Sequence, residues 1–364
     1  MPPHPRAWIE IDPVALEHNL TQIQARLPQS KIMAVIKADA YGHGLNIAAK
    51  ALRHADEFGV TDFVEALTLR EIDAFKAITV LSGDFTVLDL LSIDAKNIRP
   101  VVFSSAQVAA LDSAKLSEPL HVWLKVDTGM GRLGFNVEQI QAVASRLDSL
   151  ASVASISLMT HLANADDIHN QASAEQVDTF LALSKSYDWR DISILNSGGV
   201  YNGFDAKEQI IRPGLMLYGA SPMLSDSDVA ETFDLRPAMT FKARVISVNK
   251  VAAGTTIGYG SGYIAESETN IACISCGYAD GYPRNLPHGT PVFINGHIVP
   301  LVGRVSMDLI TVDIQGLPIA YGDIATLWGQ HNPVELIAGL ASTIAYDLLV
   351  GVTPRVHRKI TNGR

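Results

Sequence analysis

Short apolar runs alternate with amphipathic stretches of helical spacing from about residue 30 to residue 220. An apolar run of a few residues between such stretches is typical of a strand buried in a parallel sheet. Strands that alternate with helices in this way predict an α/β fold, and eight of them predict a (β/α)8 TIM-type barrel. A doubly wound open sheet is the alternative for the same order of elements. The eight predicted strands are Ile32–Lys37, Phe58–Phe63, Ile78–Ser82, Arg99–Ser104, His121–Asp127, Ser155–His161, Ile192–Asn196 and Ile211–Tyr218.

The amphipathic stretches predict the helices that surround the strands. Asp12 is suited to cap the first helix, and Pro13 has the fixed φ that favours a first helical turn. The predicted helices are Val14–Leu27, Leu45–His54, Val64–Ala77, Ala106–Ala114, Val137–Leu147 and Ala172–Ser186.

After Tyr218 the pattern changes to short β-rich runs separated by Gly, Pro and Asn, which predicts a second, mostly β domain. We expect the barrel to span residues 10–230 and the second domain residues 235–364, with Ser221–Asp234 as the linker. The predicted strands of the second domain include Thr240–Val248, Ile271–Ser275, Thr290–Ile294 and Ile310–Ile314.

Composition narrows the class of partner. With 28 Lys and Arg against 38 Asp and Glu, the net charge of −10 disfavours nucleic acid and anionic membranes, which select clustered basic residues. No apolar run approaches the ~20 residues of a membrane helix, and the first residues lack the apolar core of a signal peptide. We therefore expect a cytoplasmic protein.

The two cysteines form a C-x-x-C pattern, Cys273 to Cys276. The surrounding run reads as a buried strand, on which residues three apart face opposite sides. No second pair is available for a zinc site. We expect no metal site.

In a barrel, chemistry is concentrated at the carboxyl ends of the strands. The first predicted strand ends at Lys37, whose amine is desolvated there and so becomes a nucleophile for carbonyl groups. The last two strands lead into Asn196-Ser197-Gly198-Gly199 and Pro213-Gly214-Leu215, where small residues let backbone N–H groups approach an anion. An amine that faces a phosphate pocket suggests pyridoxal 5′-phosphate (PLP).

A competing motif lies after the fifth predicted strand. Gly129-Met130-Gly131-Arg132-Leu133-Gly134 matches the G-x-G-x-x-G fingerprint of dinucleotide sites. Asp148 has about the right spacing for the acid that binds ribose, but it lies near a helix end rather than after the next strand. An NAD-dependent enzyme is therefore the runner-up. Lys125 and Arg132 flank this turn, and two neighbouring cations favour an anion between them.

Seven motifs in order along nearly the whole chain resemble those of alanine racemases. They are residues 34–44 (AVIKADAYGHG), 125–134 (KVDTGMGRLG), 212–214 (RPG), 258–260 (GYG), 277–282 (GYADGY), 303–308 (GRVSMD) and 343–346 (TIAY). The resemblance implies a PLP-binding barrel with a C-terminal β domain, in a head-to-tail homodimer with shared active sites. It also implies that the N-terminal strand, at about residues 1–9 and centred on Ala7–Ile11, packs with the C-terminal domain.

The same resemblance implies interconversion of L-alanine and D-alanine, either to supply peptidoglycan with D-alanine or for alanine catabolism. By position, Lys37 holds PLP and acts as one base, and Tyr259 of the partner subunit acts as the other. Arg212 faces the pyridine nitrogen, His161 lies against the ring, and Arg132 contacts the cofactor and the substrate.

Further residues take roles by the same resemblance. The backbone N–H of Met307 meets the substrate carboxylate, and Lys125 is carbamylated in many relatives. The phosphate group is held by Tyr41, Ser197, Gly214, Leu215 and Tyr346, with Asn196 in the same cofactor-binding loop. Tyr278 and Arg284 line the entrance, together with Tyr346.

The chemistry agrees with this interpretation. Racemisation needs one base on each face of the planar α-carbon. A guanidinium cannot accept a proton, so Arg212 keeps the pyridine nitrogen unprotonated, which disfavours side transamination and argues against decarboxylases of the same barrel class. A single-domain PLP carrier would share Lys37 but would lack the second domain.

Overall fold

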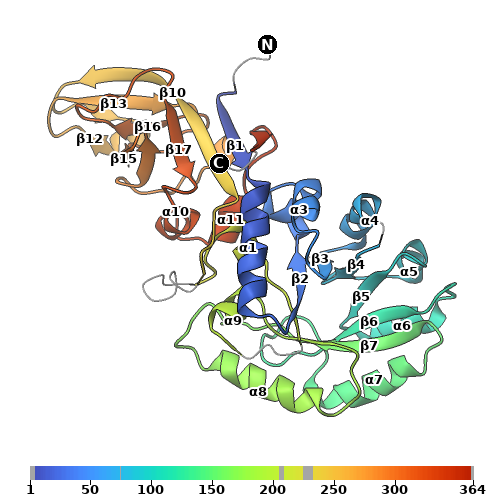
Figure 1. Ribbon diagram of the computed structural model, residues 1–364. Helices are drawn as coiled ribbons and strands as arrows, with labels where there is room; N and C mark the ends of the chain where they lie inside the picture. Colours follow the sequence, from blue (N-terminus) through green and yellow to red (C-terminus); the bar gives the residue numbers. More distant parts are fainter. Residues whose placement is uncertain (1–4, 74, 205–208, 224–232, 362–364) are drawn as a thin grey trace.

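The computed structural model describes residues 5–73, 75–204, 209–223 and 233–361. The chain forms a barrel of parallel strands and a separate, mostly β domain, which lie side by side in Figure 1. None of the helices in the described ranges is both long enough and apolar enough to cross a membrane.

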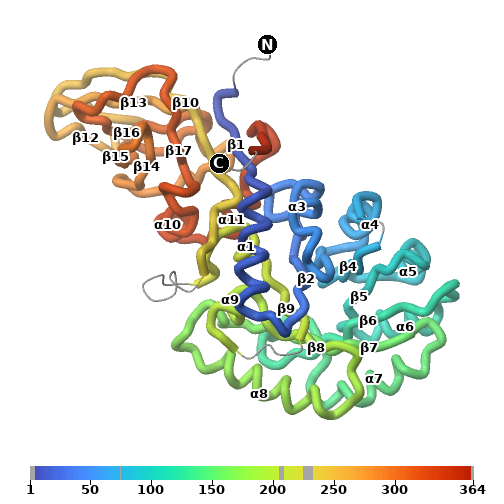
Figure 2. The backbone as a smooth tube through the Cα atoms, viewed as in Figure 1, coloured from blue at the N-terminus to red at the C-terminus, as the bar shows by residue number. Residues whose placement is uncertain are grey.

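The barrel sheet has eight parallel strands in the order β8-β7-β6-β5-β4-β3-β2-β9. The strands at the two ends of this order are β8 and β9. A parallel bridge between Asn196, which follows β8, and Arg212, which follows β9, joins them, so the ring is nearly closed (Figure 2). This confirms the predicted barrel and excludes the doubly wound sheet. The strands are β2 (Lys31–Val35), β3 (Glu57–Val60), β4 (Ala77–Val80), β5 (Ile98–Val102), β6 (Leu120–Lys125), β7 (Val153–Met159), β8 (Ile192–Ser193) and β9 (Ile210–Ile211).

Helices surround this sheet, as Figure 1 shows. The side chain of Asp12 accepts hydrogen bonds from the backbone N–H groups of Val14 and Ala15, and Pro13 is the first helical residue, so the predicted cap is confirmed. The short helix α5 was not predicted. The helices are α1 (Pro13–Arg26), α3 (Leu45–Ala51), α4 (Phe63–Ile72), α5 (Val87–Ser92), α6 (Ser105–Ser113), η1 (Val137–Gln139), α7 (Ile140–Asp148), α8 (Ala172–Ser184) and α9 (Ser197–Tyr201).

Every predicted barrel strand runs past the carboxyl end of the observed one, and the difference matters most at β2, β8 and β9. β2 ends at Val35, and Lys37 begins a separate turn, α2 (Lys37–Tyr41). β8 ends at Ser193, and β9 ends at Ile211 before the 3-10 helix η2 (Leu215–Tyr218). The predicted ends of these strands were wrong because an apolar run does not distinguish a buried strand from a buried turn.

The second domain is built on an eight-stranded sheet in the order β13-β16-β15-β14-β17-β10-β1-β18, in which β13 also pairs with β10. β1 pairs with β10 and β18, which confirms that the N-terminal strand belongs with this domain. The strands are β1 (Ala7–Ile11), β10 (Met239–Val251), β13 (Thr269–Ile274), β14 (Pro291–Ile294), β15 (His297–Val302), β16 (Ile310–Asp313), β17 (Ile324–Trp328) and β18 (His357–Ile360), with a hairpin of β11 (Thr256–Ile257) and β12 (Tyr263–Ile264).

Two short helices follow β17 in the chain, α10 (Val334–Leu340) and α11 (Ala345–Val350). They pack on each other, and α11 packs on α2 at the mouth of the barrel. A Cβ at Gly42 would lie 2.4 Å from the carbonyl oxygen of Leu349, so the end of α2 packs directly on the α11 backbone. Of the predicted linker Ser221–Asp234, residues 224–232 lie outside the described part of the chain. The domain boundaries at residues 230 and 235 stay predictions.

Candidate active site

A cavity of about 590 Å³ opens at the carboxyl ends of the barrel strands. Ten of the residues predicted from sequence line it: Lys37, Tyr41, Lys125, Arg132, His161, Asn196, Ser197, Arg212, Gly214 and Tyr346. Leu215 is buried and lines an adjoining cavity of about 250 Å³, which shares His161, Asn196 and Tyr346 with the first. The fold therefore brings the inner half of the predicted site together.

Lys37 enters the cavity from an unusual turn. The next four residues, Ala38 to Tyr41, all have positive φ values, between 52° and 55°. A left-handed conformation costs about 1–2 kcal/mol for each residue that carries a Cβ. The start of the turn is held by Glu65, whose Oε1 accepts the Ala38 N–H at 2.7 Å. Asp39 connects the turn to the start of α3, because its Oδ1 accepts the Leu45 N–H at 2.8 Å. Neither acid was identified from the sequence.

The amine of Lys37 is shifted toward its neutral form. Burial lowers its pKa and the Arg132 charge lowers it further, while Glu65 opposes both effects. A neutral amine can attack a carbonyl carbon and can accept a proton. The direction of this pKa shift is the one expected from burial, although Lys37 lies beyond the end of the strand.

Arg212 is a fixed, buried cation beside His161. It is 5% exposed, and its Nη2 donates to the carbonyl oxygen of Thr160 at 2.5 Å and to that of Ile194 at 3.2 Å. Its Nη1 donates to the hydroxyl of Ser193, and Nη2 lies 3.4 Å from His161 Nδ1. Burial lowers the pKa of Arg212 to about 10, so the group remains charged at neutral pH. Burial and the neighbouring cations, Arg212 first, lower the pKa of His161 and keep it neutral.

Lys125 is 7% exposed and points into the same cavity. Burial lowers its pKa to about 8, and the charges of Arg212 and Arg132 contribute. Within the described part of the chain, Lys37, Lys125, Arg132 and Arg212 form no salt bridge with an acid. Four cations without acidic partners make the cavity a site for anions.

The glycine-rich loop after β6 is folded around an acid. The carboxylate of Asp127 accepts the backbone N–H groups of Gly129, Met130, Gly131 and Arg132 at 2.9 to 3.1 Å. A dinucleotide phosphate would need these same N–H donors, and Asp127 already occupies them. The G-x-G-x-x-G spacing of residues 129–134 therefore does not form a dinucleotide site, and the folded loop places Arg132 at the cavity instead. Asp127 is the only acid within this motif, a signal from which its role could have been inferred.

A compact polar cradle lies at the other side of the cavity. The N–H of Gly214 donates to Ser197 Oγ at 2.9 Å, and a Cβ at position 214 would lie 2.4 Å from Tyr41 Oη. Asn196 accepts the Gly199 N–H at 2.9 Å and caps α9. The backbone N–H of Leu215 has no acceptor among the described residues. Hydroxyl groups and a free amide around a glycine fit a phosphate group.

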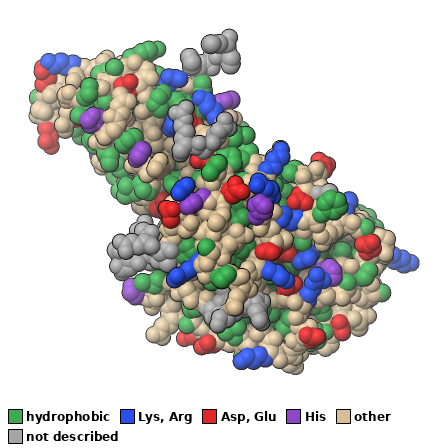
Figure 3. All heavy atoms as spheres, viewed as in Figure 1, with side chains coloured by type: hydrophobic (Ala, Val, Ile, Leu, Met, Phe, Trp, Pro, Cys, Tyr) green, Lys and Arg blue, Asp and Glu red, His purple; other side chains and the backbone are tan. Residues whose placement is uncertain are grey.

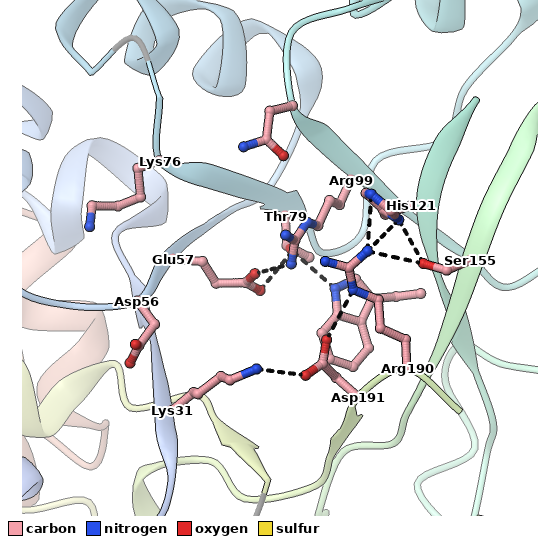
Figure 4. A network of polar contacts seen from close by, with 12 residues as sticks. Lys31, Asp56, Glu57, Lys76, Thr79, Arg99, His121, Ser155, Arg190 and Asp191 are labelled. Carbon is pink, nitrogen blue, oxygen red and sulfur yellow. Dashed lines mark hydrogen bonds and ion pairs between the residues drawn. The ribbon is translucent and has the colours of Figure 1, made fainter. Parts of the chain in front are cut away.

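The opposite end of the barrel contrasts with this cavity (Figure 4). There Arg99 pairs with Glu57 at 2.6 Å, and Lys31 pairs with Asp191 at 3.1 Å. Thr79 also donates to Glu57, at 3.0 Å. Charges at the amino ends of the strands satisfy one another, which is typical of the structural end of a barrel.

The four remaining predicted residues do not line this cavity. Tyr259 (in η3, Tyr259–Ser261) is 72% exposed, and Met307 is 53% exposed, both on the C-terminal domain. Tyr278 (in η4, Tyr278–Asp280) and Arg284 are also exposed. The Tyr278 N–H donates to Ser306 O at 3.0 Å, which joins two of these loops, while the N–H of Met307 has no acceptor among the described residues. The chain thus carries a second group of candidate residues, separate from its own cavity.

The surface shows no dominant charged patch on the face drawn in Figure 3, where acidic and basic side chains intermix over both domains. Within the described ranges no cluster of three or more His, Cys, Asp or Glu side chains could hold a metal ion.

Comparisons with known proteins cover nearly the whole chain. The family described as "Alanine racemase, N-terminal domain" matches residues 11–222, and "Alanine racemase, C-terminal domain" matches residues 238–360. Alanine racemase from Shewanella piezotolerans is 44% identical over 359 residues, which are 98% of this chain and 99% of that protein. The Photobacterium profundum enzyme is 43% identical over 352 residues, 96% of this chain and 97% of its own.

Solved structures agree. The biosynthetic alanine racemase from Pseudomonas aeruginosa has a TM-score of 0.94 at 38% identity, covering 99% of this chain and 100% of its own. Alanine racemase from Acinetobacter baumannii has a TM-score of 0.93 at 35% identity, covering 98% of this chain and 100% of its own.

Proposed function

Because the chain is an enzyme that belongs to the alanine racemase family, we propose that it interconverts L-alanine and D-alanine with PLP held in the barrel cavity. The observation that carries the proposal is the cavity itself. It combines one amine shifted toward neutrality, three further cations without acidic partners, and a cradle of hydroxyl groups around Gly214.

The residues present fit PLP at both ends. Lys37 would hold the cofactor covalently, and Tyr41, Ser197, Tyr346 and the N–H of Leu215 would hold its phosphate beside Gly214. Arg212 would face the pyridine nitrogen and His161 the ring, with Asn196 holding the α9 turn. When bound, PLP supplies an aldehyde that condenses with an amine, with loss of water, and a conjugated ring that stabilises negative charge at the substrate α-carbon.

Racemisation requires a second base opposite Lys37, and the two tyrosines and the histidine among the described cavity residues are poorly suited to that role. Burial raises the pKa of Tyr41, and burial and then Asp166 raise that of Tyr346 to about 12, so both phenols stay protonated. The pKa of His161 is lowered, which makes it a weak base. Tyr259 of the partner subunit is our candidate for this base. The candidate rests on the resemblance of residues 258–260 to a motif of alanine racemases and on the exposure of the same residue on the C-terminal domain of this chain.

A head-to-tail homodimer would bring the exposed loops of one subunit to the cavity of the other. The free N–H of Met307 of the partner subunit would then receive the substrate carboxylate, together with Arg132. Tyr278 of the partner subunit and Arg284 of the partner subunit would line the entrance. In this arrangement Lys37 accepts or donates a proton on one face of the α-carbon and Tyr259 of the partner subunit acts on the other.

Arg212 would set the reaction type. Its hydrogen bonds fix the guanidinium, which has no lone pair with which to accept a proton. The pyridine nitrogen beside it would therefore remain unprotonated and withdraw less charge from the substrate. This role of Arg212 would favour return of a proton to the substrate α-carbon over side transamination.

Lys125 is a candidate for carbamylation. A pKa of about 8 leaves part of the amine neutral near pH 7, and a neutral amine can add to CO2 and then release a proton. The resulting carbamate anion would lie between Arg132 and Arg212. It would thereby supply the negative charge that these cations lack.

D-alanine made by such an enzyme can supply peptidoglycan, and the reverse direction can serve alanine catabolism. The structural relative from Pseudomonas aeruginosa is described as biosynthetic, which favours the first role. We propose a cytoplasmic location for either role.

The direct test uses the purified protein with PLP. Borohydride reduction should attach PLP to the peptide that contains Lys37, and L-alanine in D2O should yield D-alanine that carries deuterium at the α-carbon. A protein that binds PLP but leaves L-alanine unchanged would contradict the proposed activity.

A further inference from the structure

A buried histidine that the proposed mechanism does not use contacts the turn that carries Lys37. The His43 side chain has no exposed surface, and its Nδ1 lies 3.0 Å from the carbonyl oxygen of Ala40 and 2.9 Å from that of Tyr41. Both partners can only accept, so Nδ1 carries the proton and donates it to them. Two successive carbonyl groups therefore converge on one ring nitrogen.

We propose that His43 is a positioning residue, which holds the end of the left-handed turn and thereby places Lys37 and Tyr41 for PLP binding. This inference rests on the proposed function of Lys37 as the residue that holds PLP. It adds a role for a side chain that touches neither cofactor nor substrate.

The need for such a residue follows from the backbone. Ala38, Asp39, Ala40 and Tyr41 all adopt left-handed conformations, which residues with a Cβ disfavour. Glu65 holds the start of the turn, and Asp39 connects its middle to the Leu45 N–H beyond its end. The carbonyl groups of its last two residues, Ala40 and Tyr41, accept hydrogen bonds from His43.

The ring of His43 also ends a column of aromatic side chains that leads to the cavity. Its centroid lies 4.5 Å from that of Tyr218, which stacks on Tyr41 at 4.6 Å, and Tyr41 lies 5.7 Å from Tyr346. Tyr218 Oη donates to the carbonyl oxygen of Val35, the last residue of β2, at 3.0 Å. His43 thus connects the end of the turn to the strand that precedes Lys37.

The protonation state of the ring suits this role. Nε2 is buried without a hydrogen-bond partner in the described structure. Burial lowers the pKa of His43 to about 4, with a smaller contribution from the Arg358 charge, against the effect of the two carbonyl groups. The ring therefore stays neutral, with its single proton on Nδ1, throughout the range in which the enzyme would work.

Three variants separate the donor from the ring. His43→Phe keeps an aromatic ring but removes the N–H, whereas His43→Asn places an amide N–H near the position of Nδ1. His43→Leu matches Asn in size without a donor. His54→Phe is the control, because His54 is an exposed histidine in the turn that follows α3.

The readouts are the dissociation constant of PLP for the apoprotein, the rate of borohydride-trapped attachment at Lys37, and the melting temperature of the apoprotein. We expect His43→Phe and His43→Leu to weaken PLP binding at least about tenfold, which is the effect of 1.4 kcal/mol. His43→Asn should retain most of the affinity, and His54→Phe should match wild type.

A lower melting temperature with unchanged PLP affinity in His43→Phe would show a merely structural role and overturn the proposal. If the Phe variant does not fold, the Asn and Leu pair decides, because equal PLP affinities in the two would overturn it. Failure of wild-type protein to attach PLP at Lys37 would instead contradict the proposed function, so the two failures are distinguishable.

Discussion

The barrel cavity and the exposed loops of the C-terminal domain carry the two halves of the candidate site in opposite states. In the cavity, Arg212 and Lys125 are 5% and 7% exposed, and hydrogen bonds fix the arginine. On the C-terminal domain, Tyr259 and Met307 are 72% and 53% exposed, and neither lines the barrel cavity of its own chain. The residues of the barrel cavity thus come together within one subunit, whereas the residues on the C-terminal domain are exposed on its surface.

This difference separates two tasks. A cofactor that stays bound is served by a buried site with fixed groups, which a single chain can build. Proton transfer on both faces of the substrate needs a second group opposite Lys37. The mouth of a barrel is open to solvent on that side, so the group has to come from a segment that packs over the mouth. In the proposed homodimer, the position of Tyr259 on another domain would let a second copy both cover the cavity and supply the base.

Removal of the inner base should have the largest effect. Lys37→Ala removes both the residue that would hold PLP and one of the two bases, so racemisation should be abolished and the visible absorbance of lysine-bound PLP lost. Lys50→Ala, an exposed lysine on α3, is the control and should behave as wild type. Full activity of the Lys37 variant without added amine would contradict the proposed role of the barrel cavity in binding PLP and in catalysis.

Removal of the outer base should leave cofactor binding intact. Tyr259→Phe keeps the ring, so racemisation should fall at least ~100-fold, the low end for loss of a general acid–base group, while PLP affinity stays unchanged. Solvent deuterium should still enter D-alanine, which presents its proton to Lys37, but exchange into L-alanine should largely stop. Tyr321→Phe, at another exposed tyrosine of the domain, is the control. Equal loss of exchange for both enantiomers would contradict the assignment of faces.

A change at Arg212 should alter the kind of reaction more than its rate. Arg212→Gln keeps a donor but removes the fixed charge, and we expect racemisation to fall about tenfold, as for loss of a hydrogen bond to a charged group. Pyruvate, the product of side transamination, should appear alongside D-alanine and can be measured with a coupled dehydrogenase. Slower racemisation with no pyruvate would show that Arg212 does not control the reaction type.

The smallest effect concerns Lys125 and depends on pH. With a pKa of about 8, its neutral fraction rises from roughly one-tenth at pH 7 to roughly three-quarters at pH 8.5. Carbamate formation from ¹³C-bicarbonate, followed by NMR, should therefore increase several-fold over this range, with a modest gain in activity. The signal should be absent in Lys125→Ala, and a signal that persists there would place the modification elsewhere.

Much of the inner half was predictable because apolar runs mark buried strands, and the strand ends then indicate which side chains converge. Lys125, His161 and Arg212 were found in this way. The turn after Lys37 was not, because Ala38-Asp39-Ala40-Tyr41 carries no glycine to indicate positive φ. Its left-handed form depends on side chains elsewhere in the fold, such as Glu65.

The outer half gave no local signal of function. Tyr259 lies between two glycines, as many surface tyrosines do, and its role came only from the resemblance to alanine racemases. Its use as a base depends on a second chain, so neither the pattern of one sequence nor the packing of one subunit could reveal it. Asp127 was missed for a different reason. It is the only acid within residues 125–134, but its four N–H partners come together only once the loop has folded.

Complementation between two inactive variants tests most directly whether each active site is built from two chains. Lys37→Ala and Tyr259→Phe homodimers are mixed in equal amounts under conditions of demonstrated subunit exchange. Each heterodimer should contain one intact site, with Lys37 from one subunit and Tyr259 from the other, so activity should recover to about one quarter of wild type. Activity that stays at the level of the separate variants, despite exchange, would place Tyr259 in the site of its own subunit or in no site at all.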